Sequence, residues 1–359
     1  MADLIANQKF SVIALQEVKG ENTVKDLVEK TQLCNSYAYV HCEDLYKELS
    51  EKFGEKSSKE IERTGVVKSQ SGGELAFVYK RSELELVTDV DFYHEISQGV
   101  NSAYARLIDG LAIAVVGCLA ATPLTKEAKS NADKEESIKN GSGRLGTGGA
   151  VLGLSRYVES KLGVGKVNEK GSLKDSVKEV ISAIFRPPLI AAFKSLDGRN
   201  IDIRLINIHS RFSFQKTGIS DIKGRQDEMK ALAGDIFSAV KSQPTGEFRT
   251  AYTFVAGDFN LEPKHLDMEQ WGLGAKRGVA QKEKSTLKLV NSKEVEDNGD
   301  EPIYETVHSY DHFIYDKDLF PKESDVEVAI LKEANEFFVG TGANRRAISD
   351  HYPIQICVD

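Results

Sequence analysis

The sequence predicts an α/β fold in which two β-sheets pack face to face and helices flank them. Short apolar runs recur along the chain, which is typical of buried strands. Helical patterns separate some of these runs, whereas turn signals such as Asp197-Gly198 join others into hairpins. Because hairpins are too frequent for a purely parallel sheet, two packed sheets are the more natural arrangement.

The individual elements follow from hydrophobic periodicity and from turn residues. Helices are expected where apolar residues recur at helical spacing, namely at residues 2–10, 23–33, 43–53 and 221–241. Strands are expected where apolar residues run together or alternate, namely at 11–18, 74–81, 83–92, 189–195, 201–210, 252–260, 309–316 and 351–358. The chain therefore mixes hairpins with helical crossovers.

The texture of the sequence changes between residues 95 and 183. An Ala-rich apolar block, a charged run and a Gly-rich stretch follow one another there. We interpret this segment as a mostly helical insertion with a Gly-rich loop, which divides one domain into residues 1–94 and 184–359. The "GSGRLG" stretch formally matches a dinucleotide-binding pattern, but it follows a charged run instead of a strand, so a loop is favoured. A local excess of Lys and Arg between 141 and 178 is either a grip for a phosphate backbone or a solvated helix face.

Composition restricts the class of protein. A chain of 359 residues can bury a substantial core, and its net charge of −8 gives no overall attraction to polyanions. The four cysteines lie far apart without the spacing of a zinc site, and the longest apolar run is too short for a membrane-spanning helix. A cytoplasmic location is expected, with secretion left open if an N-terminal segment has been removed.

Polar side chains repeatedly stand at the ends of predicted buried strands. They are Glu17, His209, Asp258, Asn260, Asp311, Asp350 and His351. Each of them alone is more often a turn, capping or structural residue than a ligand. Strand ends of a layered sheet converge on one rim, however, and ligand sites tend to form there. The repetition therefore predicts one shared site.

The residue types at this rim suit phosphoester hydrolysis. Carboxylates and an amide are hard oxygen ligands, which favour Mg²⁺, with Mn²⁺ or Ca²⁺ as alternatives. Mg²⁺ held by few carboxylates takes phosphate oxygens among its remaining ligands. Two histidines add groups that can donate a proton or a hydrogen bond to an oxyanion near neutral pH.

The ordered motifs "LQEV", "NIHS", "GDFN", "YDHF" and "SDHYP" resemble those of the endonuclease/exonuclease/phosphatase superfamily. "GDFN" and "ISDHYPI" are similar to deoxyribonuclease I in particular. The resemblance covers residues 1–94 and 184–359, and the insertion lies outside it. It implies a deoxyribonuclease I-like two-sheet fold with a metal-dependent phosphoesterase site at one rim.

The resemblance also implies roles for the acidic and imidazole groups. Glu17 matches the metal-binding glutamate of the family, and Asp350 matches a second acidic residue that helps to bind metal. His351 matches a histidine that the family pairs with an aspartate, here Asp311. A buried carboxylate fixes the tautomer of an imidazole and makes the ring more basic.

The remaining matched residues would act on water and on phosphate. Asp258 would orient and deprotonate the attacking water, and Asn260 would donate to a phosphate oxygen. His209 matches a histidine that stabilises the phosphate or the leaving oxygen. Lys19 falls where deoxyribonuclease I has a phosphate-contacting arginine, and a solvated surface lysine is an equally good interpretation.

One departure from the family concerns its first strand. Members normally begin with a strand whose asparagine reaches the metal, ahead of the helix with which this sequence starts. We take residues 110–120, the run "GLAIAVVGCLA", as a candidate strand for that place, with Cys118 near the position of the asparagine. The alternatives are that the original N-terminus has been lost, or that another segment or a protein partner fills the place.

The sequence therefore predicts a Mg²⁺-dependent phosphodiesterase, an endonuclease that hydrolyses DNA by in-line attack of water. A phosphomonoesterase or a sphingomyelinase-like phosphodiesterase of the same fold is the enzymatic alternative. A catalytically silent binding module, with a protein partner at the insertion or at the first-strand position, is the alternative outside enzymes.

Overall fold

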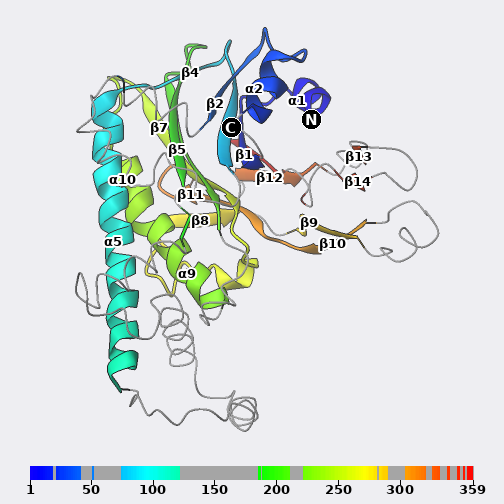
Figure 1. Cartoon of the computed structure of the whole chain (residues 1–359). Coiled ribbons are helices and arrows are strands. Elements are labelled where there is room, and N and C mark those ends of the chain that lie inside the picture. The colour runs from blue at the N-terminus through cyan, green and yellow to red at the C-terminus, as the bar shows by residue number, and fades with distance from the viewer. Residues whose placement is uncertain are drawn as a thin grey trace, which may run out of the picture. The chain divides into compact units, whose positions relative to one another are not determined.

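The structure is a computed structural model, and its elements are labelled in Figure 1. It describes residues 1–18, 22–41, 51, 74–121, 185–186, 188–210, 221–280, 283–289, 304–320, 326–331, 338–339, 346–347, 351 and 354–358. Contacts divide the chain into two units, each of which is compact. Unit 1 comprises Met1–Ser102, Arg186–Ser210 and Met229–Asp359, and unit 2 comprises Ala103–Phe185 and Arg211–Glu228.

The larger sheet has six strands in the order β4-β5-β6-β7-β11-β8. These strands are β4 (Leu84–Leu86), β5 (Leu189–Ser195), β6 (Ile201–His209), β7 (Thr250–Asp258), β8 (Arg277–Ala280) and β11 (Asp311–Asp316). Only β6 and β7 run parallel, and the other neighbours are antiparallel. A parallel pair needs a crossover, and the helical segment 221–241 connects these two strands.

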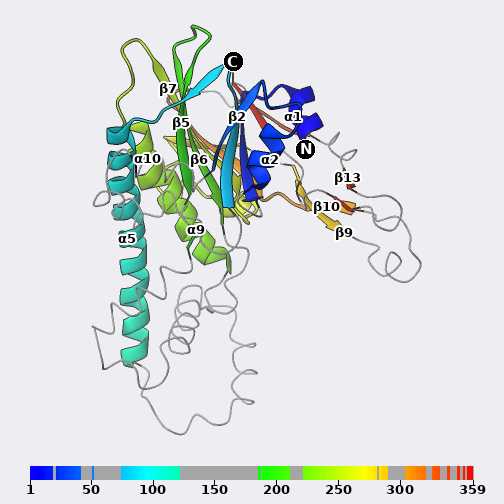
Figure 2. The same ribbon diagram turned by 45° about the horizontal axis from the view of Figure 1, so that its top comes forward.

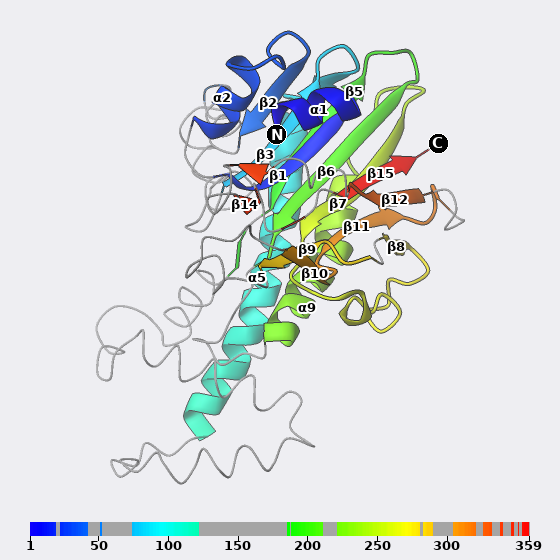
Figure 3. The same ribbon diagram turned by 90° about the vertical axis from the view of Figure 1, so that its right-hand side faces the viewer.

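A second layer of strands faces this sheet. Its three-stranded part has the order β1-β3-β2, with β1 (Val12–Val18), β2 (Tyr37–His41) and β3 (Glu74–Lys80). Its two-stranded part pairs β12 (Val326–Ile330) with β15 (Ile354–Val358). β1 packs against β6 and β7, β15 against β11, and β12 against β8 (Figure 3). The predicted two-sheet α/β architecture is thereby confirmed.

Two short pairs of strands complete the described β-structure. β9 (Thr286–Leu289) pairs with β10 (Tyr304–His308), and β13 (Phe338–Val339) pairs with β14 (Arg346–Ala347). The sequence predicted none of these four strands. Polar residues interrupt the apolar patterns of β9 and β10, and β13 and β14 have only two residues each, so hydrophobic periodicity gives little signal for them.

The helices differ in length and in role. The described helices and turns of helix are α1 (Ala2–Gln8), α2 (Thr23–Glu29), α5 (Val90–Ala121), α9 (Asp221–Ala231), the π-helical turn η1 (Leu232–Ile236), α10 (Phe237–Lys241) and the 3₁₀ turn η2 (Pro263–His265). α10 lies beside the six-stranded sheet and packs on β6 and β7 (Figure 2). Within the described ranges, no helix combines the length and the apolar character needed to cross a membrane.

Several predicted elements are confirmed in detail. The Asp197-Gly198 hairpin joins the antiparallel strands β5 and β6, and Gly198 has the positive φ of 80° that such a turn requires. The helix predicted at 221–241 exists as the continuous run α9-η1-α10. The strand predicted at 83–92 is wrong beyond Leu86, because α5 begins at Val90.

The candidate strand at 110–120 is also wrong. These residues form the last turns of α5, so they cannot pair with β1 as a strand. Alanine and leucine are strong helix formers, which explains why this apolar block is helical. Among the described residues, β1 is paired with β3 alone. The expected insertion boundary at residue 95 falls inside α5, and the division of the chain into a domain and an insertion stays a prediction.

Arg204 is a buried charged residue on β6 that caps the C-terminal end of helix α10. Its side chain is on β6, and only 1% of the residue is exposed. Its Nη1 donates to the carbonyls of Val240 and Lys241 at 2.8 and 2.9 Å, and its Nη2 donates to those of Gln243 and Pro244 at 2.8 and 3.0 Å. The last carbonyls of a helix lack partners within the helix, so Arg204 satisfies those at the end of α10.

Replacing Arg204 should therefore destabilise the fold. Arg204→Leu leaves the four carbonyls without their donor, and we expect the free energy of unfolding to fall by about 3 kcal/mol. Chemical denaturation monitored by circular dichroism measures this loss. Arg199→Leu is the matched control, because the Arg199 side chain is 57% exposed and pairs with Asp197 in a turn. Equal stability of the two variants would contradict this account of Arg204.

Candidate active site

Three of the predicted site residues stand side by side across the six-stranded sheet. His209 ends β6, Asp258 ends β7 and Asp311 begins β11. The strand register aligns His209 with Asp258, and Asp258 with Asp311. Since neighbouring residues on one rung of a sheet point to the same face, the three side chains converge at one rim.

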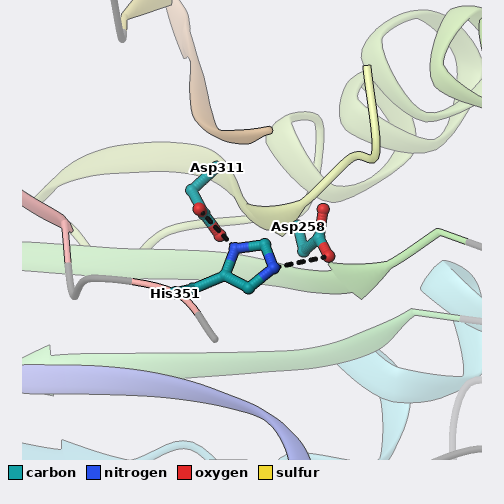
Figure 4. Close-up of side chains that lie close together, drawn as sticks. All are labelled: Asp258, Asp311 and His351. Carbon is teal, nitrogen blue, oxygen red and sulfur yellow. Dashed lines mark hydrogen bonds and ion pairs between the residues drawn. The ribbon is translucent and has the colours of Figure 1, made fainter. Parts of the chain in front are cut away.

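His351 joins this rung from another part of the chain (Figure 4). Its Nδ1 lies 2.7 Å from Asp311 Oδ2, and its Nε2 lies 3.7 Å from Asp258 Oδ2. An ionised carboxylate can only accept, so Nδ1 carries the proton that His351 donates to Asp311. The Nε2 edge of the ring is thereby directed at Asp258.

Asp258 is held in place by Asn260. The Asn260 backbone N–H donates to Asp258 Oδ1 at 2.7 Å, and its Nδ2 donates to Asp258 Oδ2 at 3.1 Å and to the Ser210 carbonyl at 2.8 Å. Asn260 has a φ of 49°, a backbone conformation that costs energy for residues other than glycine. Both amide protons of Asn260 are already engaged, so donation to a phosphate would have to replace one of these bonds.

Glu17 approaches the same site from β1. It has a φ of 54°, and the register of β1 against β3 shifts between Leu15 and Val18, which marks a bulge around Glu17. Its side chain is 52% exposed, and its Oε1 lies 3.7 Å from His209 Nε2. A bulge re-aims a side chain, and here it accompanies a carboxylate placed at the rim.

Asn207 ties the strand of Glu17 to the strand of His209. It is fully buried on β6, two residues before His209. Its Nδ2 donates to the carbonyls of Leu15 and Ala76 at 2.9 and 3.2 Å, and its Oδ1 accepts from Gln16 Nε2 at 2.7 Å. These bonds fix β1 and β3 over β6, so they set the position of Glu17 relative to His209.

Arg186 determines the state of His209. Its Nη1 lies 2.9 Å from His209 Nδ1 and 3.3 Å from Nε2. A guanidinium has no acceptor, so the shorter contact makes Nδ1 the acceptor and leaves the proton on Nε2. Burial, the Arg186 cation and His351 together lower the pKa of His209 to about 4, although Asp311 opposes this shift. His209 is therefore neutral at neutral pH, with its N–H near Asp258 and Glu17 at 3.7 Å each.

The donor set at this rim fits a divalent cation. Ligand atoms of Asp258, Asp311 and His351 lie within 4.8 Å of one another. The half-exposed carboxylate of Glu17 stands on the solvent side of His209. Carboxylate oxygens with one imidazole suit Mg²⁺ or Mn²⁺ better than a structural zinc, which usually takes thiolates or several imidazoles.

The structure thus brings together six of the eight residues that the sequence singled out. They are Glu17, His209, Asp258, Asn260, Asp311 and His351. Lys19 and Asp350 lie outside the described residues. The chemical roles expected for all eight stay predictions.

Sequence reasoning missed Arg186, Asn207 and Ser285, which contact the predicted residues. Asn207 has a visible signal, because it is a polar residue that alternates with His209 at the end of β6, where Leu205, Ile206 and Ile208 are apolar. Arg186 comes shortly before a predicted strand, a position that is equally common for surface arginines without a role in a site. Ser285 lies in a short polar segment without any pattern, so neither of these two has a signal in the sequence.

Comparisons with known proteins find similarity in structure but not in sequence. No protein-family model matches this chain. No curated protein matches it either.

Thirty-two chains of known structure match the fold. One is TDP2 of D. rerio complexed with a single-strand DNA product, which is 12% identical, with coverage of 98% of this chain and 87% of that chain and a TM-score of 0.41. Another is an endonuclease/exonuclease/phosphatase family protein from Bacteroides thetaiotaomicron, at 12% identity, coverage of 99% and 86% and a TM-score of 0.42. A third is the mannosyl-6-phosphatase Bt3783 of Bacteroides thetaiotaomicron VPI-5482, at 12% identity, coverage of 100% and 88% and a TM-score of 0.42. At this similarity, no substrate or activity follows for this chain.

Proposed function

We propose that this protein is a divalent-metal-dependent phosphodiesterase that hydrolyses DNA. The observation that carries the proposal is the position of Asp258 between two imidazoles, with Nε2 of His209 and Nε2 of His351 each 3.7 Å from its Oδ2. Two imidazoles, which can act as acids or as bases, therefore lie near one buried carboxylate. The Arg186 cation contacts one of these imidazoles, that of His209. The preference for DNA rests on the deoxyribonuclease I-like motifs "GDFN" and "SDHYPI".

The reaction proceeds by in-line attack of water on phosphorus. Asp258 Oδ2 accepts the proton of the attacking water as the new P–O bond forms and the bond to the leaving oxygen breaks. His209, neutral and protonated on Nε2, donates a hydrogen bond to a phosphate or leaving oxygen. His351, which Asp311 orients, stabilises negative charge beside Asp258 as an imidazolium, which carries protons on both Nδ1 and Nε2.

A divalent cation would be held by the carboxylates of Glu17 and of Asp350, which lies outside the described residues, while Asp258, Asp311 and His351 keep the roles given above. When bound, it supplies charge that neutralises the phosphate and polarises the bond under attack. Arg186 contacts both ring nitrogens of His209 and is a cation suited to a phosphate oxygen. Asn260 keeps Asp258 in a fixed orientation throughout.

Hydrolysis of DNA should require the metal. We expect nicking of plasmid DNA in Mg²⁺ or Mn²⁺, loss of activity in excess chelator and recovery when Mg²⁺ is restored. Agarose electrophoresis of the plasmid measures this. Robust nicking in chelator would contradict a metal-dependent mechanism.

A substrate panel separates this function from its alternatives. The panel contains double-stranded DNA, single-stranded DNA, RNA, inositol phosphates and sphingomyelin, with Asp258→Asn as the blank. Faster release of phosphate from a monoester than cleavage of DNA would replace the proposal with a phosphomonoesterase. Absence of any turnover above the blank would favour a binding module.

Removing Arg186 should change the titration of His209. Arg186→Gln takes away a cation that opposes protonation, so the pKa of His209 should rise from about 4 towards the ordinary value of 6.5. Burial, the largest cause, remains, so the pKa should stay below 6.5. Nuclear magnetic resonance titration of the metal-free protein measures the shift, with Arg199→Gln as an exposed control. An unchanged pKa would exclude the contact between Arg186 and His209.

A further inference from the structure

Ser285 is a buried hydroxyl that contacts the catalytic rung. None of the residue is exposed, and its Oγ donates to Asp311 Oδ2 at 2.5 Å. The same oxygen accepts the proton of His351 Nδ1 at 2.7 Å. Two donors on one carboxylate oxygen fix the plane of the carboxylate, because rotation of the group would break both bonds.

The segment around Ser285 also holds His351 and the strand next to Asp311. Thr286 forms an antiparallel bridge with His351, and the backbone N–H of Ser285 donates to the His308 carbonyl at 2.7 Å. Residues 285–286 therefore connect both partners of the Asp311–His351 pair, one through a side chain and the other through the backbone.

We propose that Ser285 is a positioning residue for the Asp311–His351 pair. Its hydroxyl holds Asp311 in the orientation that keeps the proton of His351 on Nδ1 and directs Nε2 towards Asp258. Ser285 does not contact the substrate in this role, and it acts only through Asp311. The inference rests on the proposed hydrolytic function for its kinetic consequence, whereas its structural consequence can be measured without any substrate.

Ser285→Ala tests this role against a matched control. Ser309→Ala also removes one buried hydroxyl from the same region, but that hydroxyl donates to a backbone carbonyl instead of a site residue. With bis-p-nitrophenyl phosphate and Mg²⁺, we expect kcat of Ser285→Ala to fall about tenfold with KM unchanged, because a hydrogen bond to a charged group is lost. Ser309→Ala should keep kcat within about twofold of the unsubstituted protein.

Proton nuclear magnetic resonance of the metal-free protein gives the second readout. The Nδ1 proton of His351 should resonate far downfield, and it is assigned by its loss in His351→Gln. In Ser285→Ala this resonance should shift or broaden, while in Ser309→Ala and Ser285→Thr it should remain. If no substrate is turned over but the resonance responds as described, the proposed function fails and the positioning role stands. The positioning role is overturned if Ser285→Ala matches Ser309→Ala in the resonance, or if folded Ser285→Thr behaves like Ser285→Ala.

Discussion

Asp258→Asn is expected to lower kcat for phosphodiester hydrolysis by about two orders of magnitude or more. The substitution removes the negative charge between His209 and His351 and the oxygen that accepts the proton of water. In the unsubstituted protein, Asn260 Nδ2 donates to Asp258 Oδ2 at 3.1 Å. The amide group of the variant can place its own NH₂ group against this donor. Steady-state kinetics with Mg²⁺ and a plasmid or a chromogenic diester measures the loss.

Asp202→Asn is the matched control for this substitution. Asp202 is another buried aspartate at the opposite end of β6, where Arg249 Nε donates to its Oδ1 at 2.5 Å. We expect it to lose some stability while kcat stays within about twofold. If Asp258→Asn kept full activity, or if both variants lost activity equally, Asp258 could not be the proton acceptor.

The juxtaposition of the six described candidate residues was largely predictable, because these residues occupy strand ends. Buried strands have strong hydrophobic patterns, so the ends of β6, β7 and β11 are visible in the sequence. The hydrophobic pattern does not give the register between paired strands. The alignment of His209 with Asp258, and of Asp258 with Asp311, depends on pairings between distant parts of the chain, which no local pattern encodes.

The residues that support the site were less predictable for the same reason. Ser285 reaches Asp311, and Asn207 reaches Leu15, across long separations in sequence. A serine in a polar segment looks like any loop residue until the segment is placed against its partner. Hydrogen bonds of buried polar groups are set by tertiary structure, so periodicity can mark a polar residue in a strand, as at Asn207, but it does not indicate the partner.

Helix and strand were confused where an apolar run lacked a clear period. Residues 111–121 are almost continuously apolar, and such a run fits a buried strand or a buried helix equally well. Length decides between them, because the run continues the helical pattern that begins at Val90. The resemblance to a family with an additional first strand drew the interpretation towards a strand, and the structure corrects it.

Gly257→Ala is expected to be the most destabilising single substitution near the site. Gly257 precedes Asp258 in the "GDFN" motif and has a φ of 143°, which side chains other than glycine rarely adopt. A Cβ atom there would lie 1.9 Å from the carbonyl oxygen of Ile208, its neighbour on β6. Because the atoms that this Cβ would meet are backbone atoms of Ile208, the strands would have to separate, at a cost of about 4 kcal/mol or more.

Two other glycines separate the causes of that cost. Gly272→Ala meets no atom within 4 Å but has a φ of 73°, so it should lose only about 1 kcal/mol from backbone strain. Gly110→Ala lies inside α5 with open space around it, and it should be neutral or stabilising, because alanine favours helix by up to about 1 kcal/mol. The denaturation midpoint should therefore be highest for Gly110→Ala, intermediate for Gly272→Ala and lowest for Gly257→Ala. If Gly257→Ala were as stable as Gly272→Ala, the close approach of β6 and β7 beside Asp258 would be wrong. Glycine would then be required at position 257 only for its positive φ.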